Sequence, residues 1–228
     1  MGGRPEIAAP PEAAVPARAD RRKAESRQRL LAAARRLFIE RGYHATRPQD
    51  IARAADVGHG TFYLHFAEKR ACFLAFAEAA RAELEDFVRQ RLAGIEGVEP
   101  QLRALLEALI DYAEQHPGVL KAAMTDVSVI AAEGQAGESL IDRWAVEWAA
   151  SLRAGVRAGA IRADYDVDAI GHAIVGLIRG AAGFGVRERA RRSEIVETVA
   201  RFLARALVPE EAGEAAQHHK FFWGKAES

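Results

Sequence analysis

Cysteine is nearly absent from this chain of 228 residues, in which Cys72 stands alone. A single thiol excludes an intrachain disulfide framework and the cysteine-rich ligand sets of structural zinc sites. Most lone cysteines are small buried hydrophobes, so we expect that role for Cys72, with a redox-sensing thiol as the alternative. The adjacent residues His218 and His219 have no third ligand at metal-binding spacing. We therefore expect neither a metal site nor a cofactor.

Long hydrophobic runs are also absent. No uninterrupted apolar segment approaches the ~20 residues that span a bilayer, and the first 23 residues lack the apolar core of a secretory signal. We expect a cytoplasmic protein with no membrane partner. Residues 1–20 are rich in Pro, Ala and Gly and show no hydrophobic period, so they are expected to form a disordered tail.

Net charge is absent as well, because 32 basic residues balance 32 acidic ones. The balance is uneven along the chain, however. Residues 1–70 hold 14 Lys and Arg against 8 Asp and Glu, whereas residues 71–228 hold 18 against 24. An excess of positive charge confined to the first third favours a polyanionic partner for that part of the chain alone.

The alternation of apolar and polar residues that is typical of strands is missing, and apolar residues recur at helical spacing instead. Leu30, Leu37 and Phe38 predict a helix from about residue 21 that ends at Gly42, because glycine commonly ends helices. Asp166 is one of three aspartates that favour the start of a later helix. Further helices are predicted over about 69–92, 101–115, 118–133, 137–159, 167–189 and 193–208. The fold class is therefore expected to be all-α.

Two short helices joined by a tight turn are predicted within residues 42–69, whose sequence is GYHATRPQDIARAADVGHGTFYLHFAEK. Pro48 suits the first position of the first helix, and Gly58 is expected to supply the turn. Phe62 and Phe66 lie four residues apart and should dock the second helix on its neighbours. This is the pattern of a helix-turn-helix, whose second helix enters the major groove of DNA.

Several side chains of this segment suit contact with DNA. Gly60 and Thr61 are small enough to let the second helix approach base edges, and Tyr63 and His65 carry polar ends at phosphate distance. Lys69 begins the next predicted helix, where backbone N–H groups and a cation together can hold a phosphate. The segment is therefore the candidate DNA-binding site.

The same segment resembles the DNA-binding domain of the tetracycline-repressor (TetR) family. The resemblance covers about residues 21–77 and rests on GHGTFYLHFAEK, with GY and DIARAADVG upstream. It implies about nine helices, a homodimer, and a small-molecule effector in the C-terminal core whose binding moves the DNA-binding domains apart and releases the operator. The expected division is residues 21–68 for DNA binding, 69–208 for ligand binding and dimerisation, and 209–228 for a C-terminal tail.

The resemblance assigns DNA contacts to nine residues, namely Thr46, Arg47, His59, Gly60, Thr61, Tyr63, Leu64, His65 and Lys69. His59 to Thr61 and Tyr63 fall where the family contacts bases, the next two residues where it touches the DNA backbone, and Lys69 on its phosphate-binding lysine. Arg47 departs from the family's usual Ser or Thr, and Asp56 and His59 replace a common Gly and a common Ser. The motif is intact, but the operator sequence is not predicted.

The C-terminal two-thirds is less specific. Six residues of its middle helices are candidates for lining an effector pocket, namely Met124, Thr125, Ser128, Trp144, Trp148 and His172. Pockets and cores have similar compositions, so ordinary core positions are the alternative for each. His172 in particular suits a surface position or a hydrogen-bonded histidine.

Five glycines crowd the helix predicted over 167–189, although each costs about 1 kcal/mol relative to alanine inside a helix. Close helix–helix approach explains them, either across a dimer or within the chain. The family pairs its last two helices in an intersubunit four-helix bundle. Here that bundle would use the apolar residues Ile170, Ile174, Leu177, Ile178, Phe184, Ile195, Val199, Phe202 and Leu203.

The sequence thus predicts a TetR-like regulator, most simply a repressor, that binds a palindromic operator in double-stranded DNA as a homodimer. One alternative is a helical protein-interaction scaffold without DNA binding. A second is an all-α enzyme, which we do not expect because no nucleophile signature or phosphate loop is present. The basic residues from Arg18 to Lys23 fit either an arm that reaches DNA or a solubilising tail. Whether Lys220–Trp223 docks on the core is left open.

Overall fold

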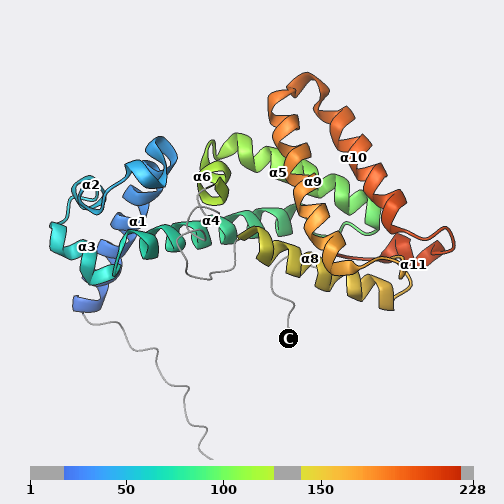
Figure 1. The fold of residues 1–228 in the computed structure, drawn as a ribbon, viewed down its shortest axis with the longest axis horizontal. Helices are drawn as coiled ribbons and strands as arrows, with labels where there is room; N and C mark the ends of the chain where they lie inside the picture. The colour runs from blue at the N-terminus through green and yellow to red at the C-terminus, as the bar shows by residue number, and fades with distance from the viewer. Residues whose placement is uncertain (1–17, 126–139, 222–228) are drawn as a thin grey trace, which may run out of the picture.

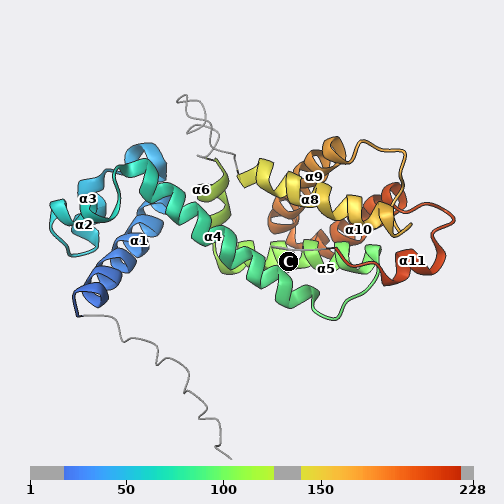
Figure 2. The same cartoon turned by 90° about the horizontal axis from the view of Figure 1, so that it is seen from below.

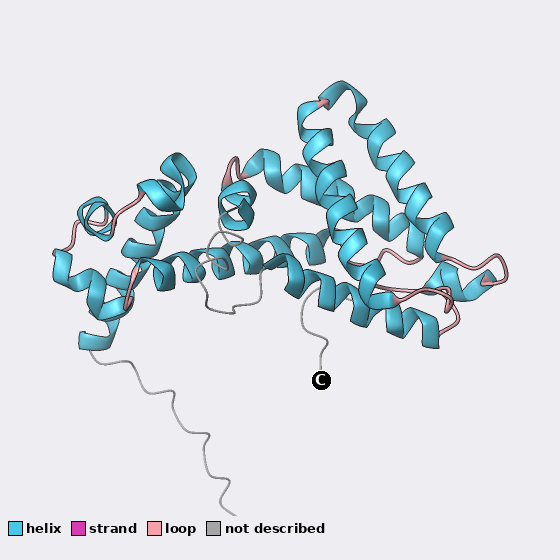
Figure 3. Ribbon diagram, in the orientation of Figure 1, coloured by secondary structure: helices cyan, strands magenta, loops and turns pink. Residues whose placement is uncertain are grey.

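In the computed structural model, residues 18–125 and 140–221 are described, and they form ten α-helices, one short 3-10 helix and no strand (Figures 1 and 3). The N-terminal helices are α1 (Arg18–Ala45), α2 (Pro48–Ala54), α3 (His59–His65) and α4 (Lys69–Leu92). They are followed by α5 (Val98–Gln115), α6 (Val119–Thr125), α8 (Leu140–Arg157), α9 (Val167–Arg187), α10 (Arg192–Leu207) and α11 (Gly213–His218). The predicted all-α class is confirmed. The helix expected over 118–133 is described only as far as Thr125.

The end of α1 is built by two residues. Gly42 adopts φ 78°, which lies in the left-handed region that favours glycine, and interrupts the helix before its last turn. Thr46 follows, and its Oγ1 donates a hydrogen bond to the carbonyl oxygen of Gly42 at 2.8 Å and lies 3.3 Å from that of Leu37. Carbonyls at a helix end lack intrahelical donors, so this hydroxyl supplies one.

A first hydrophobic core joins α1, α2 and α3 to the N-terminal half of α4 and to α6. Leu30, Phe38, Ile51, Phe62 and Phe73 are fully buried in it. The rings of Phe38 and Phe73 meet edge to face with centroids 5.1 Å apart. Burial of each such side chain contributes roughly 1.5–3 kcal/mol. This burial holds α1, α2 and α3 together on α4.

A second core is formed by the C-terminal half of α4 with α5, α8, α9 and α10. Figures 1 and 2 show α4 running from one group of helices to the other. Leu84 and Val88 of α4 are buried in this second core, whereas Phe73 and Phe76 of the same helix are buried in the first. A displacement of α4 therefore acts on both cores.

The helix α9 begins as its sequence predicted, because the Asp166 side chain accepts hydrogen bonds from the backbone N–H groups of Asp168 and Ala169. Its glycines divide into two kinds. A Cβ at Gly171 would lie 2.5 Å from the carbonyl oxygen of Ala145, and one at Gly185 would lie 2.6 Å from Ile110. These two glycines are explained by packing within the chain.

By length and composition, α9 is also the one helix among the described residues that is apolar enough to cross a membrane. The sequence alone did not single it out, because His172 and Arg179 interrupt its apolar residues. The helix packs against α5, α8 and α10 in the second core, as core helices of water-soluble proteins do.

The chain returns to the second core after α11. The side-chain amide of Gln101 donates to the carbonyl oxygen of His219 at 2.7 Å and accepts from the backbone N–H of Phe221 at 2.8 Å. The buried Phe221 ring lies 5.1 Å from that of Trp148. Of the segment Lys220–Trp223, the part up to Phe221 is thus docked, and the rest lies outside the described residues.

Candidate DNA-binding surface and effector cavity

The helix α3 rests on the first core through its two phenylalanines. Phe62 and Phe66 are buried with ring centroids 5.6 Å apart, which confirms the docking role predicted for them. The turn before α3 differs from the prediction. Asp56 adopts φ 52°, whereas Gly58 is extended with φ −61°. Asp tolerates the left-handed region better than most residues, so Asp56 occupies the position where glycine is common in the family.

The opposite face of α3 is open to solvent. The side chain of Leu64 is 75% exposed and that of Tyr63 is 49% exposed, with the His59 and Tyr63 rings edge to face at 5.2 Å. No heavy atom lies within 4 Å of the position that a Cβ of Gly60 would occupy, so another molecule can approach the backbone there closely. His59, Gly60 and Tyr63 belong to the set that the sequence predicted to meet base edges, and Leu64 to the set predicted to meet the DNA backbone.

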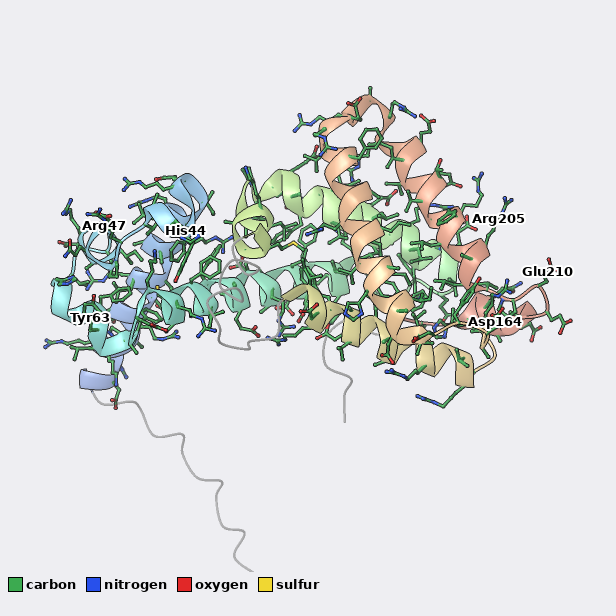
Figure 4. All side chains as sticks on the ribbon, in the orientation of Figure 1. His44, Arg47, Tyr63, Asp164, Arg205 and Glu210 are labelled. Carbon is green, nitrogen blue, oxygen red and sulfur yellow. The ribbon has the colours of Figure 1, made fainter. Side chains whose placement is uncertain are left out.

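Cationic and imidazole groups border this face. Arg47 precedes α2 with an extended backbone and an exposed side chain, and it makes no side-chain cap to that helix. His44, in the last turn of α1, is also exposed. Figure 4 shows His44, Arg47 and Tyr63 at the end of the molecule formed by α1, α2 and α3. Sequence reasoning did not select His44, although its place directly after the GY pair was a usable signal.

The prediction that Thr46 contacts DNA is wrong for its side chain. Thr46 is fully buried, and its hydroxyl is directed to the end of α1 rather than to the outside. Thr46 thus serves the neighbouring DNA-binding surface indirectly, because its hydroxyl donates a hydrogen bond to the Gly42 carbonyl at the end of α1.

His65 and Lys69, which the sequence placed at the DNA backbone, both contact other parts of the chain. Nε2 of His65 lies 2.7 Å from Oγ of Ser26 in α1. Partial burial, and to a smaller degree Lys23 and Arg27, lower the pKa of His65 below its usual value, which favours the neutral ring. Lys69 Nζ donates to the carbonyl oxygen of Tyr43 at 2.9 Å. Each residue therefore links α3 or α4 to α1.

A cavity of about 460 Å³ lies in the C-terminal bundle between α4, α5, α6, α8 and α9. Its wall is mostly apolar, with Leu84, Leu109, Trp148, Val175, Ile178 and Val186 among the lining residues. Of the predicted lining residues, the structure brings Met124, Trp144 and Trp148 together at this wall. Ser128 and the side chain of Thr125 lie outside the described residues.

His172 does not line the cavity, so that prediction is wrong. Its ring is exposed, with Nδ1 3.0 Å from the carbonyl oxygen of Asp168 and Nε2 3.8 Å from Asp142. It lies about one helical turn before Val175, the first residue of α9 to line the cavity. Sequence reasoning missed the cations Lys121, Arg179 and Arg187 at the wall, because exposed basic residues on a helix usually form a solvated face.

Four of the residues predicted at a dimer interface are instead buried within the chain, namely Ile174, Ile178, Ile195 and Leu203. Ile174, Ile178 and Leu203 belong to the second core, and Ile195 is a buried residue of α10. Ile170, Leu177 and Val199 are half-buried. Phe184 and Phe202 remain exposed at 38% and 60%. The outer face of α9 also holds Gly176 and Gly180, with nothing within 4 Å of a Cβ at either.

Cys72 is fully buried, and burial raises the pKa of its thiol to about 12. The thiol is thus protonated and shielded, which supports the role of a buried hydrophobe over that of a redox sensor.

No group of three His, Cys, Asp or Glu side chains within 18–125 and 140–221 is arranged to hold a metal ion. His218 contacts Glu96, whereas the neighbouring His219 is buried.

Comparisons with known proteins point to one family. Residues 30–76 match the family model described as bacterial regulatory proteins, tetR family. The chain is similar to the HTH-type transcriptional repressor KstR2 of Rhodococcus jostii (strain RHA1), with 33% identity over 156 residues that cover 64% of this chain and 72% of that one. It is also 38% identical over 90 residues to the HTH-type transcriptional activator FasR of Mycolicibacterium smegmatis, covering 40% of this chain and 41% of FasR. The chain thus spans less than half of FasR.

Among solved structures, the fold is similar to that of the fatty acid degradation regulator FadR from Bacillus halodurans. The TM-score is 0.62, and the match covers 78% of this chain and 94% of that one at 19% identity. At this level of identity the likeness concerns the fold alone. The two sequence relatives named here are described as transcriptional regulators, and the solved structure as a regulator of fatty acid degradation.

Proposed function

This chain belongs to the TetR family of bacterial transcriptional regulators, and we propose that it is a homodimeric repressor that leaves a palindromic operator when a small molecule enters its C-terminal cavity. It is a DNA-binding regulator and not an enzyme. The functional division into residues 21–68 for DNA binding and 69–208 for effector binding and dimerisation belongs to this proposal. We place its action in the cytoplasm, where operator DNA is accessible.

The observation that carries the proposal is the outer face of α3. Leu64 and Tyr63 are large, exposed and apolar or amphipathic, and they lie on a helix whose other face is anchored by Phe62 and Phe66. Exposed residues of this kind on a short helix suit a groove that offers thymine methyl groups, base edges and phosphates. We propose Arg47, His59, Gly60, Thr61, Tyr63 and Leu64 as the direct contacts, with His44 added.

The second element of the proposal is the dimer. Phe184 and Phe202 are exposed apolar side chains on α9 and α10, and Gly176 and Gly180 present bare backbone to solvent. Large exposed apolar residues beside a face of small residues favour close packing of a second copy. Two-fold symmetry then presents two α3 helices to two half-sites about one turn of DNA apart, which is why the operator should be palindromic.

The third element is the route from cavity to DNA. Leu84 lines the cavity, and Lys69, at the start of the same helix α4, holds Tyr43. Fifteen residues separate them, which is roughly 22 Å along a helix at 1.5 Å per residue. A ligand that displaces α4 at Leu84 therefore changes the position of α1, α2 and α3 relative to the bundle, and with it the spacing of the two α3 helices.

Selection of genomic DNA fragments by the purified protein tests the proposal. The unmodified chain should enrich a palindromic site, with affinity that falls steeply as salt rises because phosphate contacts release counterions. Tyr63→Ala should abolish the enrichment, whereas Tyr165→Ala, a change at the opposite end of the molecule, should preserve it. If the folded dimer enriches no site, the helical-scaffold alternative gains support. If Tyr63→Ala binds the site normally, the assignment of the DNA surface is wrong.

A further inference from the structure

We infer that the cavity binds an amphipathic anion, a molecule with an apolar body and one anionic group. The inference rests on the proposed effector role of this cavity. It comes from the charges at the cavity wall, where Lys121, Arg179 and Arg187 are the only charged side chains among the described lining residues. The described wall contains no aspartate or glutamate.

Arg179 and Arg187 are placed together by the period of α9. They lie four residues before and four residues after Gly183, so all three share one face of the helix. Gly183 lines the cavity too, and a Cβ there would be 3.7 Å from Nη1 of Arg187. The lack of a side chain at Gly183 lets the Arg187 guanidinium lie close to the helix backbone at the cavity wall. Lys121 approaches the same cavity from α6.

Among the described residues, none of these three cations forms an ion pair, although the guanidinium of Arg187 lies 5.9 Å from the centroid of the Phe184 ring. Elsewhere in the bundle the arginines are commonly neutralised, as in the ion pairs Arg91–Asp111 at 2.6 Å and Arg143–Glu78 at 3.0 Å. Within 18–125 and 140–221, by contrast, no carboxylate lies within 4.0 Å of the charged groups of Lys121, Arg179 or Arg187. A bound anion therefore need not displace an ion pair between described residues.

The positive wall is not a consequence of the overall charge of this part of the chain. Residues 71–228 contain 18 Lys and Arg against 24 Asp and Glu. A cluster of three cations at one concave surface of an acidic region attracts anions and repels cationic ligands. The wall is therefore expected to favour anionic over cationic ligands.

The remainder of the wall suits an apolar body with one polar end. Trp144, Trp148 and Met124 lie beside the aliphatic side chains of the cavity. The indole Nε1–H of Trp144 is buried and has no acceptor among the described residues. A carboxylate or similar group of the ligand can supply that acceptor, because its oxygens accept hydrogen bonds from both indole and guanidinium donors. The volume of about 460 Å³ is in the range of small-molecule sites.

The test uses dodecanoate as the anionic probe, with dodecanol and dodecylammonium as probes of matched chain length and different charge. Binding is measured by calorimetry on the full chain, below the concentrations at which the probes aggregate. Dodecanoate should bind saturably, at least about tenfold more tightly than either of the other two. The combined change Arg179→Gln with Arg187→Gln should weaken dodecanoate at least about tenfold and leave dodecanol unchanged. Arg157→Gln, an exposed arginine outside the cavity wall, is the matched control.

A second measurement tests whether the probe binds in the cavity. It uses a Trp223→Phe variant, in which Trp144 and Trp148, both at the cavity wall, are the only tryptophans left. In this background, 12-bromododecanoate should quench the tryptophan fluorescence, and dodecanoate should reverse the quenching. The inference is overturned if dodecanoate does not bind, if dodecanol binds as tightly, or if the glutamine variant retains full affinity for dodecanoate.

The effect of dodecanoate on operator DNA is measured separately. Binding of the probe without release of DNA contradicts the effector mechanism proposed above and leaves the ligand class supported. Failure of the probe to bind a chain that still enriches a palindromic site contradicts the ligand class alone.

Discussion

Lys69 is tied to Tyr43 in two ways. Its ammonium donates a hydrogen bond to the Tyr43 carbonyl oxygen at 2.9 Å and lies 4.1 Å from the centroid of the Tyr43 ring. The contact joins the first residue of α4 to the end of α1, directly below the surface that we propose meets DNA. The family resemblance assigns Lys69 to a phosphate of DNA. In this structure, Lys69 also links α4, which contributes to both cores, to α1.

The first prediction concerns this link. Lys69→Ala should lower the free energy of unfolding by about 2 kcal/mol, because it removes a charged hydrogen bond and a cation–π contact. It should also weaken operator binding at low salt. Urea denaturation and a fluorescence-anisotropy titration measure the two effects. Lys121→Ala, an exposed lysine, serves as the control and should leave stability unchanged. Equal stability of the two variants would contradict the structural role of Lys69.

The second prediction concerns the buried threonine before α2. Thr46→Val keeps the shape of the side chain but removes its hydroxyl, so the carbonyl of Gly42 loses its donor. We expect a loss of about 1 kcal/mol in the free energy of unfolding. Thr46→Ser retains the hydroxyl and is the matched control for the hydrogen bond. Thermal unfolding measures both, and a fully stable valine variant would show that the hydrogen bond is unimportant.

The third prediction is a pH dependence. The pKa of His65 is lowered in the folded state, first by partial burial and then by Lys23 and Arg27. The unfolded chain therefore binds the proton more readily as the pH falls through the ordinary histidine pKa of about 6.5, so stability should fall from pH 7.5 to pH 5.5.

His65→Gln has no titrating ring and should show a smaller loss of stability over the same interval, measured by urea denaturation at each pH. The buried residue His219 has a lowered pKa for the same reason, and it contributes in the same direction to both proteins. If the free energy of unfolding falls equally with pH in the unmodified chain and in His65→Gln, His65 does not cause the pH dependence.

The fourth prediction separates the two kinds of glycine in α9. Gly171→Ala should destabilise the chain by about 1–3 kcal/mol, because the new methyl group would meet the Ala145 backbone oxygen. At Gly180, by contrast, a Cβ would have no described neighbour within 4 Å. Gly180→Leu should therefore leave the helical content intact but disrupt association through the outer face of α9. Sedimentation and circular dichroism distinguish these outcomes. A Gly180→Leu variant that remains a dimer would place the interface elsewhere.

The helices and the DNA-binding motif were predictable because both depend on contacts close in sequence. The spacing of Phe62 and Phe66 indicated which face of α3 is buried, and Gly42 indicated where α1 is interrupted. The turn was assigned to the wrong residue for a reason equally local. Glycine favours a left-handed conformation, so the sequence points to Gly58, whereas Asp56 adopts it in the structure.

The errors at the predicted dimer residues have a different origin. A helical period indicates that one face is apolar, but it does not tell whether that face packs within the chain or against a partner. Ile174 and Phe184 both belong to the apolar set of α9, yet the first is buried in the core and the second is exposed. Only the crossing of α9 with α5, α8 and α10 separates them.

The sequence by itself determined the all-α class, the helix-turn-helix and the family, because a short motif and a 3.6-residue period are properties of neighbouring residues. Only the tertiary structure decided that Lys121 from α6 and Arg179 and Arg187 from α9 line one apolar cavity. It likewise decided that Gln101 holds the backbone at Phe221, 120 residues further along the chain. Such distant pairs meet because whole helices bury their apolar faces together, and that packing sets the distance between residues that no local pattern relates.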